Sequence, residues 1–155
     1  MFDFLKKKTE INTTQIVDEI EATVYEQLKP YGFKKHGRTL HRFVSKDISQ
    51  VINFQCGRSV SPVSGHLCVN LGIRIPECSE RTFQPQAEKK KYYHEYECTI
   101  RSRLGIVSGK QETWYDLHKK TDKIIKSIIE EIKDQGIKDE NIIYICVNAI
   151  RRICI

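Results

Sequence analysis

The strongest constraint on how this chain folds is a strict alternation of apolar residues in one short segment. The alternating residues are Leu67, Val69, Leu71 and Ile73. Because successive side chains of a β-strand point to opposite faces of a sheet, this pattern predicts a strand with one apolar face. Pro76 cannot donate a hydrogen bond to a neighbouring strand, so the strand is predicted to end before it.

Three further segments favour strands. Residues 50–56 alternate in the same way, and residues 39–44 precede them across a link of hairpin length. Residues 96–104 alternate as well, which places Cys98 on the phase opposite Arg101. The chain therefore contains enough strands for a sheet of its own.

Two segments have the period of amphipathic helices. Apolar residues recur at helical spacing in residues 14–29, and Asn12 can cap the start of that helix. Residues 116–135 carry a stripe of isoleucines, and Gly136 follows where a left-handed residue ends a helix. Residues 140–155 fit either a helix or a buried strand.

These elements predict an α+β protein. We expect a mainly antiparallel sheet of about four to five strands, packed by an N-terminal helix and by a C-terminal helix or helices. The length of 155 residues fits a single domain over residues 1–155. Residues 1–11 are predicted to be flexible, and the polar residues 77–93 to form a long exposed loop.

The composition is typical of a globular protein, with 39% hydrophobic and 30% charged residues. Residues 1–8 contain no apolar run like that of a secretory signal, and no later stretch approaches the roughly 18 apolar residues that span a membrane. We therefore expect a cytoplasmic protein without membrane attachment. In that compartment the six cysteines, at positions 56, 68, 78, 98, 146 and 154, are expected to be reduced thiols.

The phase opposite the apolar one carries polar side chains on several of the predicted strands. These candidate ligand-binding residues are Asn53, Gln55, Cys68, Asn70, Arg74, Arg101 and Arg103. Amides and guanidinium groups together offer hydrogen-bond donors and acceptors to a ligand. The sequence is therefore interpreted as a non-enzymatic binding domain that engages a protein partner or a small ligand through a polar sheet face.

One alternative is nucleic-acid or other polyanion binding. The chain has a net charge of +6, and the basic Lys89-Lys90-Lys91 precedes Tyr92, Tyr93 and Tyr96, whose rings could stack on bases. The basic residues are spread over many short clusters, each of which also fits a solvated surface. Nucleic acid is thus a possible partner that the sequence does not favour.

The other alternative is an enzyme with a cysteine and histidine site. Cys68 shares its phase with His66, and nearby arginines would favour a thiolate. A buried, inert thiol is the simpler interpretation, so no catalytic residue is assigned. The close pairs His66-x-Cys68 and His94-x-x-x-Cys98 lack the spacing of structural zinc sites, and neither a metal nor a cofactor is predicted.

Four short motifs in order resemble the bacterial domain-of-unknown-function family numbered 4304. They are residues 28–35 around Pro30-Tyr31-Gly32-Phe33, residues 51–55, residues 69–73, and Arg103-Leu104-Gly105 ahead of Trp114-Tyr115. The resemblance covers about residues 14–135 and implies a bacterial cytoplasmic protein with a helix-flanked antiparallel sheet, but no reaction. In the first motif, proline and glycine are predicted to end the helix while both aromatic rings become buried.

Overall fold

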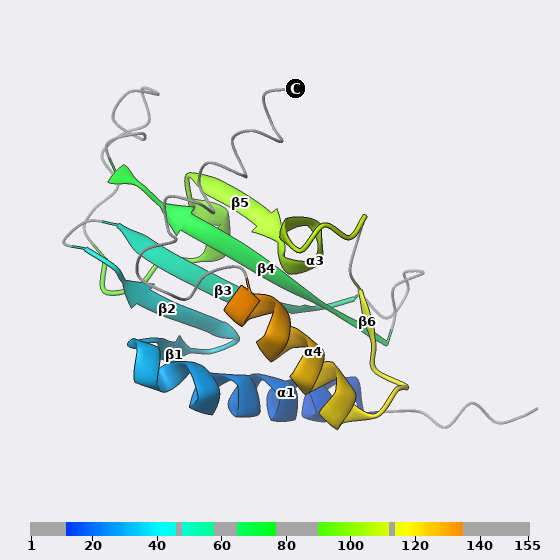
Figure 1. The fold of residues 1–155 in the computed structure, drawn as a ribbon. Helices are drawn as coiled ribbons and strands as arrows, with labels where there is room; N and C mark the ends of the chain where they lie inside the picture. Colours follow the sequence, from blue (N-terminus) through cyan, green and yellow to red (C-terminus); the bar gives the residue numbers. More distant parts are fainter. Residues whose placement is uncertain (1–11, 46–47, 58–64, 77–89, 112–113, 135–155) are drawn as a thin grey trace, which may run out of the picture.

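The computed structural model describes residues 12–45, 48–57, 65–76, 90–111 and 114–134. In these residues an antiparallel sheet carries α1 and α4 on one of its faces (Figure 1). The elements in chain order are α1 (Thr13–Leu28), the 3₁₀ turn η1 (Lys29–Tyr31), β1 (Lys34–His36), β2 (Thr39–Phe43), β3 (Ser49–Cys56), β4 (His66–Arg74), the 3₁₀ turn η2 (Glu95–Glu97), β5 (Ile100–Arg103), α3 (Leu104–Val107), β6 (Tyr115–Asp116) and α4 (Thr121–Asp134). The predicted α+β class, with an antiparallel sheet, an N-terminal helix and a C-terminal helix, is confirmed.

Within the described residues, six strands form one sheet. Strands β1 to β5 follow one another in sequence order, each antiparallel to the next, and β6 pairs with the start of β4. The sequence pattern does not predict β1, because Lys34-Lys35-His36 has no apolar alternation. The regular order of the strands means that one phase of each strand falls on one common face.

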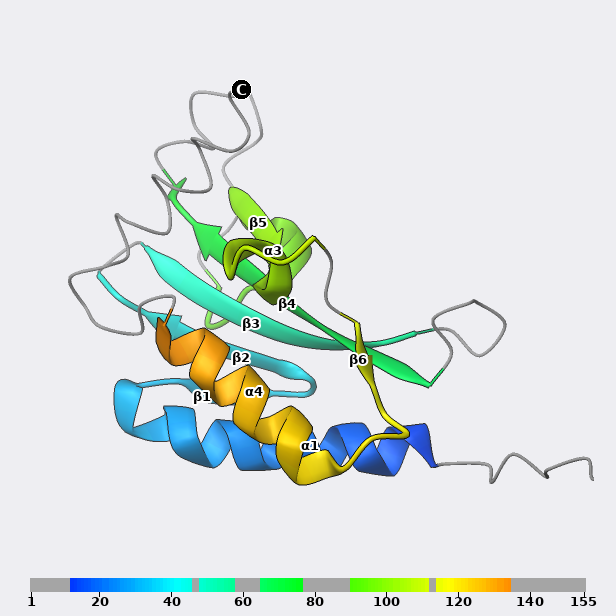
Figure 2. The ribbon, with the colours of Figure 1, turned by 45° about the vertical axis from the view of Figure 1, so that its right-hand side comes forward.

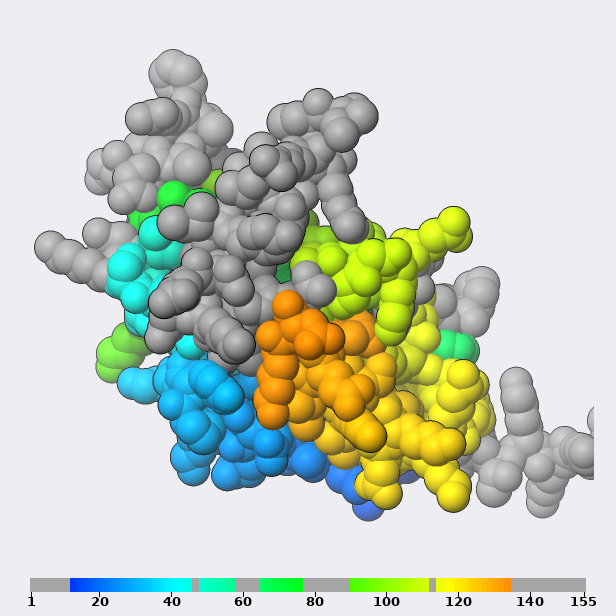
Figure 3. Space-filling view, in the orientation of Figure 1, coloured from blue at the N-terminus to red at the C-terminus, as the bar shows by residue number. Residues whose placement is uncertain are grey.

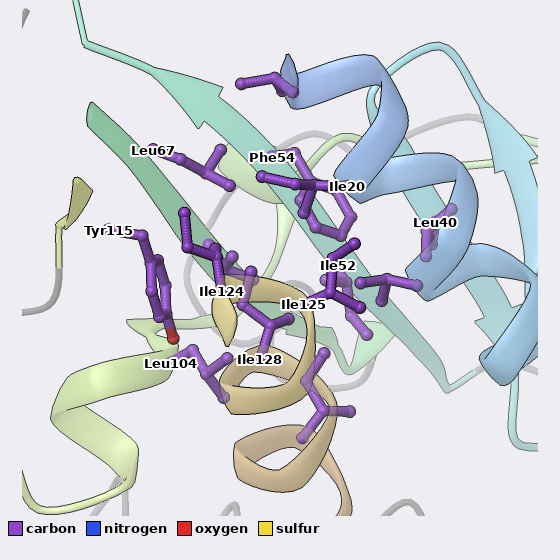
Figure 4. Close-up of a cluster of buried hydrophobic side chains, with 14 of the residues drawn as sticks. Ile20, Leu40, Ile52, Phe54, Leu67, Leu104, Tyr115, Ile124, Ile125 and Ile128 are labelled. Atoms are coloured by element: carbon purple, nitrogen blue, oxygen red, sulfur yellow. The ribbon is translucent and has the colours of Figure 1, made fainter. Parts of the chain in front are cut away.

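The hydrophobic core lies between the helices and the apolar face of this sheet (Figure 4). Figures 2 and 3 show α1 and α4 side by side, and the ribbon in Figure 2 shows them on one side of the sheet. The buried side chains come from α1 (Val17, Ile20, Val24, Leu28), from α4 (Ile124, Ile125, Ile128, Ile132) and from the strands (Leu40, Ile52, Phe54, Leu67, Val69). Isoleucine lowers helix propensity, so burial against the sheet must stabilise α4.

The two ends of α1 form largely as predicted. The side-chain oxygen of Asn12 accepts a hydrogen bond from the backbone N–H of Gln15 at 3.2 Å, which caps the helix start. After η1, Gly32 adopts a left-handed conformation with φ of 85°, which a residue with a side chain would adopt only with strain. The chain can therefore reverse into β1.

The prediction that both aromatic rings of the first motif become buried is wrong for Tyr31. Phe33 is 3% exposed, whereas Tyr31 is 45% exposed. The backbone carbonyl of Tyr31 accepts a hydrogen bond from the Arg42 guanidinium at 2.9 Å, and the same guanidinium lies 4.9 Å from the centre of the Phe33 ring. The turn is held through the Tyr31 backbone, so its ring can stay at the surface.

Residues 96–104 do not form the single predicted strand. The first of them belong to η2, β5 occupies the later part, and Leu104 begins α3 with its side chain in the main core. At η2 the Glu97 carboxylate accepts a hydrogen bond from the backbone N–H of His94 at 2.8 Å. Such a local bond competes with strand pairing and turns the chain before β5 begins.

This turn also changes the side on which Cys98 lies. A Cβ atom added to Gly72 would meet the Cys98 sulfur at 2.6 Å, and Gly72 is paired with Arg101. Cys98 therefore lies on the same face as Arg101, not on the opposite one. The strict alternation assumed from the sequence fails because the strand is interrupted.

The C-terminal helix begins at Thr121 and not at Asp116. Asp116 pairs with His66 in the ladder between β6 and β4, and its carboxylate accepts a hydrogen bond from the backbone N–H of His118 at 3.0 Å. An aspartate that bonds the backbone two residues onward favours a turn over a helix. The local chemistry of Asp116 thus delays the helix.

Several predictions concern residues outside the described ranges. They are the flexible residues 1–11, most of the expected loop (residues 77–89), Gly136 and residues 140–155. These stay predictions.

Candidate functional site

The register of the sheet gathers predicted polar residues on the face turned away from α1 and α4. Asn53 of β3 lies opposite Asn70 of β4, and Asn70 lies opposite Arg103 of β5. In the next row, Gln55 lies opposite Cys68. Five of the seven candidate residues are therefore neighbours across three adjacent strands.

The amides of this face bond to one another. The side-chain nitrogen of Asn70 donates to the Gln55 oxygen at 2.9 Å and to the Asn53 oxygen at 3.4 Å. The side-chain nitrogen of Asn53 in turn donates to the Thr39 hydroxyl at 3.1 Å. Because Asn53 is half-buried and Asn70 only 8% exposed, these bonds satisfy polar groups that would otherwise destabilise the sheet.

A cavity of about 320 Å³ opens beside this amide cluster. It is lined by Gln55, Asn70, Glu95, Arg101, Ser102, Arg103 and Ile106. Gln55 is exposed, and in the described part of the chain its side-chain nitrogen makes no hydrogen bond. That nitrogen can donate to a ligand.

The charges at the cavity come from Glu95 and two arginines. Arg101 makes a two-pronged pair with the Glu95 carboxylate, at 2.7 Å and 3.0 Å, and this bonding raises the pKa of Arg101 above its ordinary value. The guanidinium of Arg103 lies 5.2 Å from the centre of the Trp114 ring. Two guanidinium groups against one carboxylate leave the lining with an excess of positive charge.

Part of the same face is covered rather than open. Tyr93 and Cys98, from the segment that passes behind the sheet in Figure 1, form a second buried cluster with Val51 of β3. Tyr93 is 1% exposed, so the expected exposure of residues 77–93 is wrong at this position. The guanidinium of Arg74 lies 4.1 Å from the centre of the Tyr93 ring, which separates Arg74 from the cavity.

The cysteines on this face are shielded from solvent. Cys68 has no exposed surface, and its thiol lies 3.5 Å from the Asn70 oxygen as a hydrogen-bond donor. Burial, followed by the nearby Glu95 and Glu97 carboxylates, raises the pKa of the Cys98 thiol to about 12. A reactive cysteine needs access and a stabilised thiolate, so neither residue has the environment of a nucleophile.

A second group of side chains lies where β1 meets the segment around the start of η2. The sequence does not predict that these side chains lie close together. The His36 ring stacks on the Tyr92 ring with centroids 3.5 Å apart, and the His94 ring stacks on the Tyr96 ring at 5.0 Å. The tyrosines can be noticed in the sequence. His36 cannot, because its position depends on the unpredicted strand β1.

The described residues hold neither a cluster of metal-ligating side chains nor a helix that could span a membrane. No three histidine, cysteine, aspartate or glutamate side chains among them come close enough together to hold a metal ion. None of the helices in the described part has the length and apolar character needed to cross a membrane.

The fold and the cavity define the chain as an α+β domain in which one sheet face is packed by helices and the other carries polar and positively charged groups. A family model described as a domain of unknown function, DUF4304, matches residues 23–139. The chain therefore belongs to this family, as its motifs indicate. Searches of curated proteins and of solved structures found no match to the chain.

Proposed function

We propose that this protein is a non-enzymatic binding domain whose cavity beside β5 receives a carboxylate or phosphate group of a protein partner or small ligand. The observation that carries the proposal is the juxtaposition of Gln55, Arg101 and Arg103 around one cavity. Guanidinium groups and amide N–H donors are well suited to oxyanions. The excess of positive charge in the lining adds to this preference.

The amide cluster supports binding because it preorganises the donor. The Gln55 oxygen accepts from Asn70, and this bond leaves the Gln55 nitrogen as the donor for a ligand. Arg101 is likewise held in place by Glu95. Side chains that are fixed before binding lose less conformational freedom when a ligand arrives.

A binding role also agrees with the surroundings of Cys68, the residue that the enzyme alternative would use as its nucleophile. The Cys68 thiol is inaccessible and hydrogen-bonded, so it has no route to a substrate.

The proposed setting is the cytoplasm of a bacterium. The reducing cytoplasm suits the free thiols of Cys56 and Cys98, and the bacterial origin is carried over from the family resemblance.

The test measures thermal unfolding with inorganic phosphate, succinate or citrate, against chloride at matched ionic strength. A ligand that binds only the folded state raises the melting temperature in a saturable way. We expect such a rise for at least one oxyanion. We expect Gln55→Ala to reduce it and Arg103→Ala to abolish it.

The matched control is Lys126→Ala, which removes an exposed positive charge of α4 that lines neither this cavity nor its neighbours. It should respond to the oxyanion like the unaltered protein. The proposal fails if no oxyanion exceeds chloride, or if both cavity variants keep the full response.

A further inference from the structure

We propose that a surface formed by β1 and residues 90–96 binds single-stranded nucleic acid. The aromatic members of this surface are His36, Tyr92, His94 and Tyr96, and the basic members are Lys34, Lys90 and Lys91. We call it the aromatic–lysine surface. None of these seven side chains lines the cavity of the proposed function, so the two proposals stand on separate observations.

The rings of this surface form two stacked pairs that meet edge to face. His36 lies on Tyr92 with an interplanar angle of 26°, and His94 lies on Tyr96 with an angle of 11°. Tyr92 and His94 join the pairs at 89° with centroids 5.8 Å apart. Rings in contact hold one another in position, which prepares their outer faces for a flat ligand.

Tyr96 is the most accessible of the large hydrophobic side chains in the described residues, at 66% exposed. One face of its ring is used by His94, and the high exposure leaves the other for a base. Contact between an exposed aromatic ring and water is unfavourable, and a base stacked on the ring would remove that contact. Stacking on such rings is the main way in which proteins hold unpaired bases.

Two hollows adjoin this ring system. One of about 380 Å³ is lined by residues 90–92, His94 and Glu97, and one of about 430 Å³ by residues 34–36, His41, Phe43 and residues 91–92. Lys91 and Tyr92 line both hollows and stand between them. A chain of bases can therefore be received on either side of Tyr92.

The charge at this surface complements a phosphate backbone. Lys90 pairs with Glu97, and Lys35 pairs with Glu21 at 2.9 Å. Lys34 and Lys91 are exposed and have no ion-pair partner among the described residues. Two uncompensated ammonium groups beside stacked rings match a ligand that alternates phosphates with flat bases.

The combination of rings and lysines favours single-stranded nucleic acid over other polyanions. An acidic peptide or heparin would use the lysines but has no flat ring to place on Tyr96. A duplex keeps its bases stacked on each other, so their faces are not available. Of these polyanions, an unpaired strand is the one that uses both features of the surface.

The test measures fluorescence anisotropy of labelled oligothymidylate and oligouridylate with the whole protein. We expect saturable binding of at least one of the two, and the comparison tells DNA from RNA. Tyr96→Ala should weaken binding by about 5- to 150-fold, the range that corresponds to about 1–3 kcal/mol for a base–aromatic contact. Tyr92→Leu should weaken it in the same way.

The lysines are tested through the salt dependence of binding. For single strands, the slope of log affinity against log salt changes by about 0.7 for each phosphate contact. Lys34→Ala combined with Lys91→Ala should therefore reduce the slope by about 1.4. Labelled polyglutamate and duplex DNA should bind more weakly than the single strands.

Matched controls come from the helical side of the molecule. Tyr31→Ala removes a tyrosine that is 45% exposed, and Lys126→Ala removes a lysine whose side chain is 77% exposed. Both should bind like the unaltered protein. The proposal is overturned if neither oligonucleotide binds, if the tyrosine variants bind normally while the lysine variant does not, or if polyglutamate binds as tightly as the single strands.

Discussion

At the scale of single residues, His41 is a titratable side chain enclosed in the covered part of the polar face. It is 3% exposed, and its Nε2 atom has no hydrogen-bond partner in the described part of the chain. Its ring and the Phe43 ring pack edge to face, with centroids 4.7 Å apart. Burial, followed by the nearby charge of Lys34, lowers the pKa of His41 below its ordinary value. The folded protein therefore favours neutral His41.

This environment predicts a pH dependence of stability. The unfolded chain binds a proton at His41 near pH 6.5, whereas the folded protein binds it only at lower pH. The contribution of neutral His41 to the free energy of unfolding is therefore complete above pH 6.5. It is lost as the pH falls toward the lowered pKa. Urea unfolding at several pH values should give a free energy of unfolding that falls by at most about 1.4 kcal/mol per pH unit from this group.

His41→Phe should remove this part of the slope between pH 6.5 and 5. Lys34→Ala removes only the second cause of the lowered pKa, so it should reduce the slope without removing it. An identical slope in His41→Phe and the unaltered protein would contradict the interpretation.

At this scale the sequence predicts which residues share the polar face but not which of them are reachable. Alternation correctly places Asn53, Gln55 and Asn70 together, because strand phase is a local property. It does not reveal that Arg74 lies against Tyr93 or that Cys68 is completely buried. The position of Arg74 depends on a segment about 20 residues away in the sequence, which packs against the sheet.

At the scale of elements, the segment around η2 can lie close to β4 because Gly72 has no side chain. A Cβ atom there would lie 2.6 Å from the Cys98 sulfur and 2.9 Å from the Cys98 Cβ. Both distances are too short for ordinary contact. The covered part of the polar face thus requires glycine at this position.

Gly72→Ala should therefore destabilise the protein by about 1–3 kcal/mol, the usual cost of overpacking. Chemical denaturation measures the loss. Cys98→Ala removes the sulfur contact but keeps the Cβ contact, so the double variant should recover part of the loss relative to the sum of the single variants. Strictly additive losses would show that the two positions do not touch.

The elements also differ in how far the sequence predicts them. Strands β3 and β4 and helix α1 follow from periodicity, because each places a regular row of apolar side chains in the core. β1, η2 and β6 do not, because they are short and are held by partners or by local side-chain bonds at Glu97 and Asp116. The aromatic–lysine surface depends on β1 and is missed for the same reason.

At the scale of the whole molecule, α1, α4 and the apolar face of the sheet share one core (Figure 4). Ile128 of α4 has no exposed surface and lies within that core. The helices and the sheet bury their apolar side chains against each other in this one core. Neither layer can therefore lose its packing without the other. The described elements should unfold together.

Ile128→Ala should lower the free energy of unfolding by about 2–5 kcal/mol, since it leaves a cavity in the core. Circular dichroism of the helices and fluorescence of Trp114, which lies beside β6, should report the same urea midpoint. Lys126→Ala, at an exposed position of the same helix, should change the midpoint little. Separate midpoints for the two signals would refute a single cooperative core.

The sequence by itself determined the α+β class, the long strands, the N-terminal helix and the family, because periodicity and short motifs are local properties of the chain. The tertiary structure alone decided which part of the polar face stays open. Strand order, the close approach of Cys98 to Gly72 and the burial of Tyr93 depend on contacts between distant segments, and such contacts leave no regular period in the sequence.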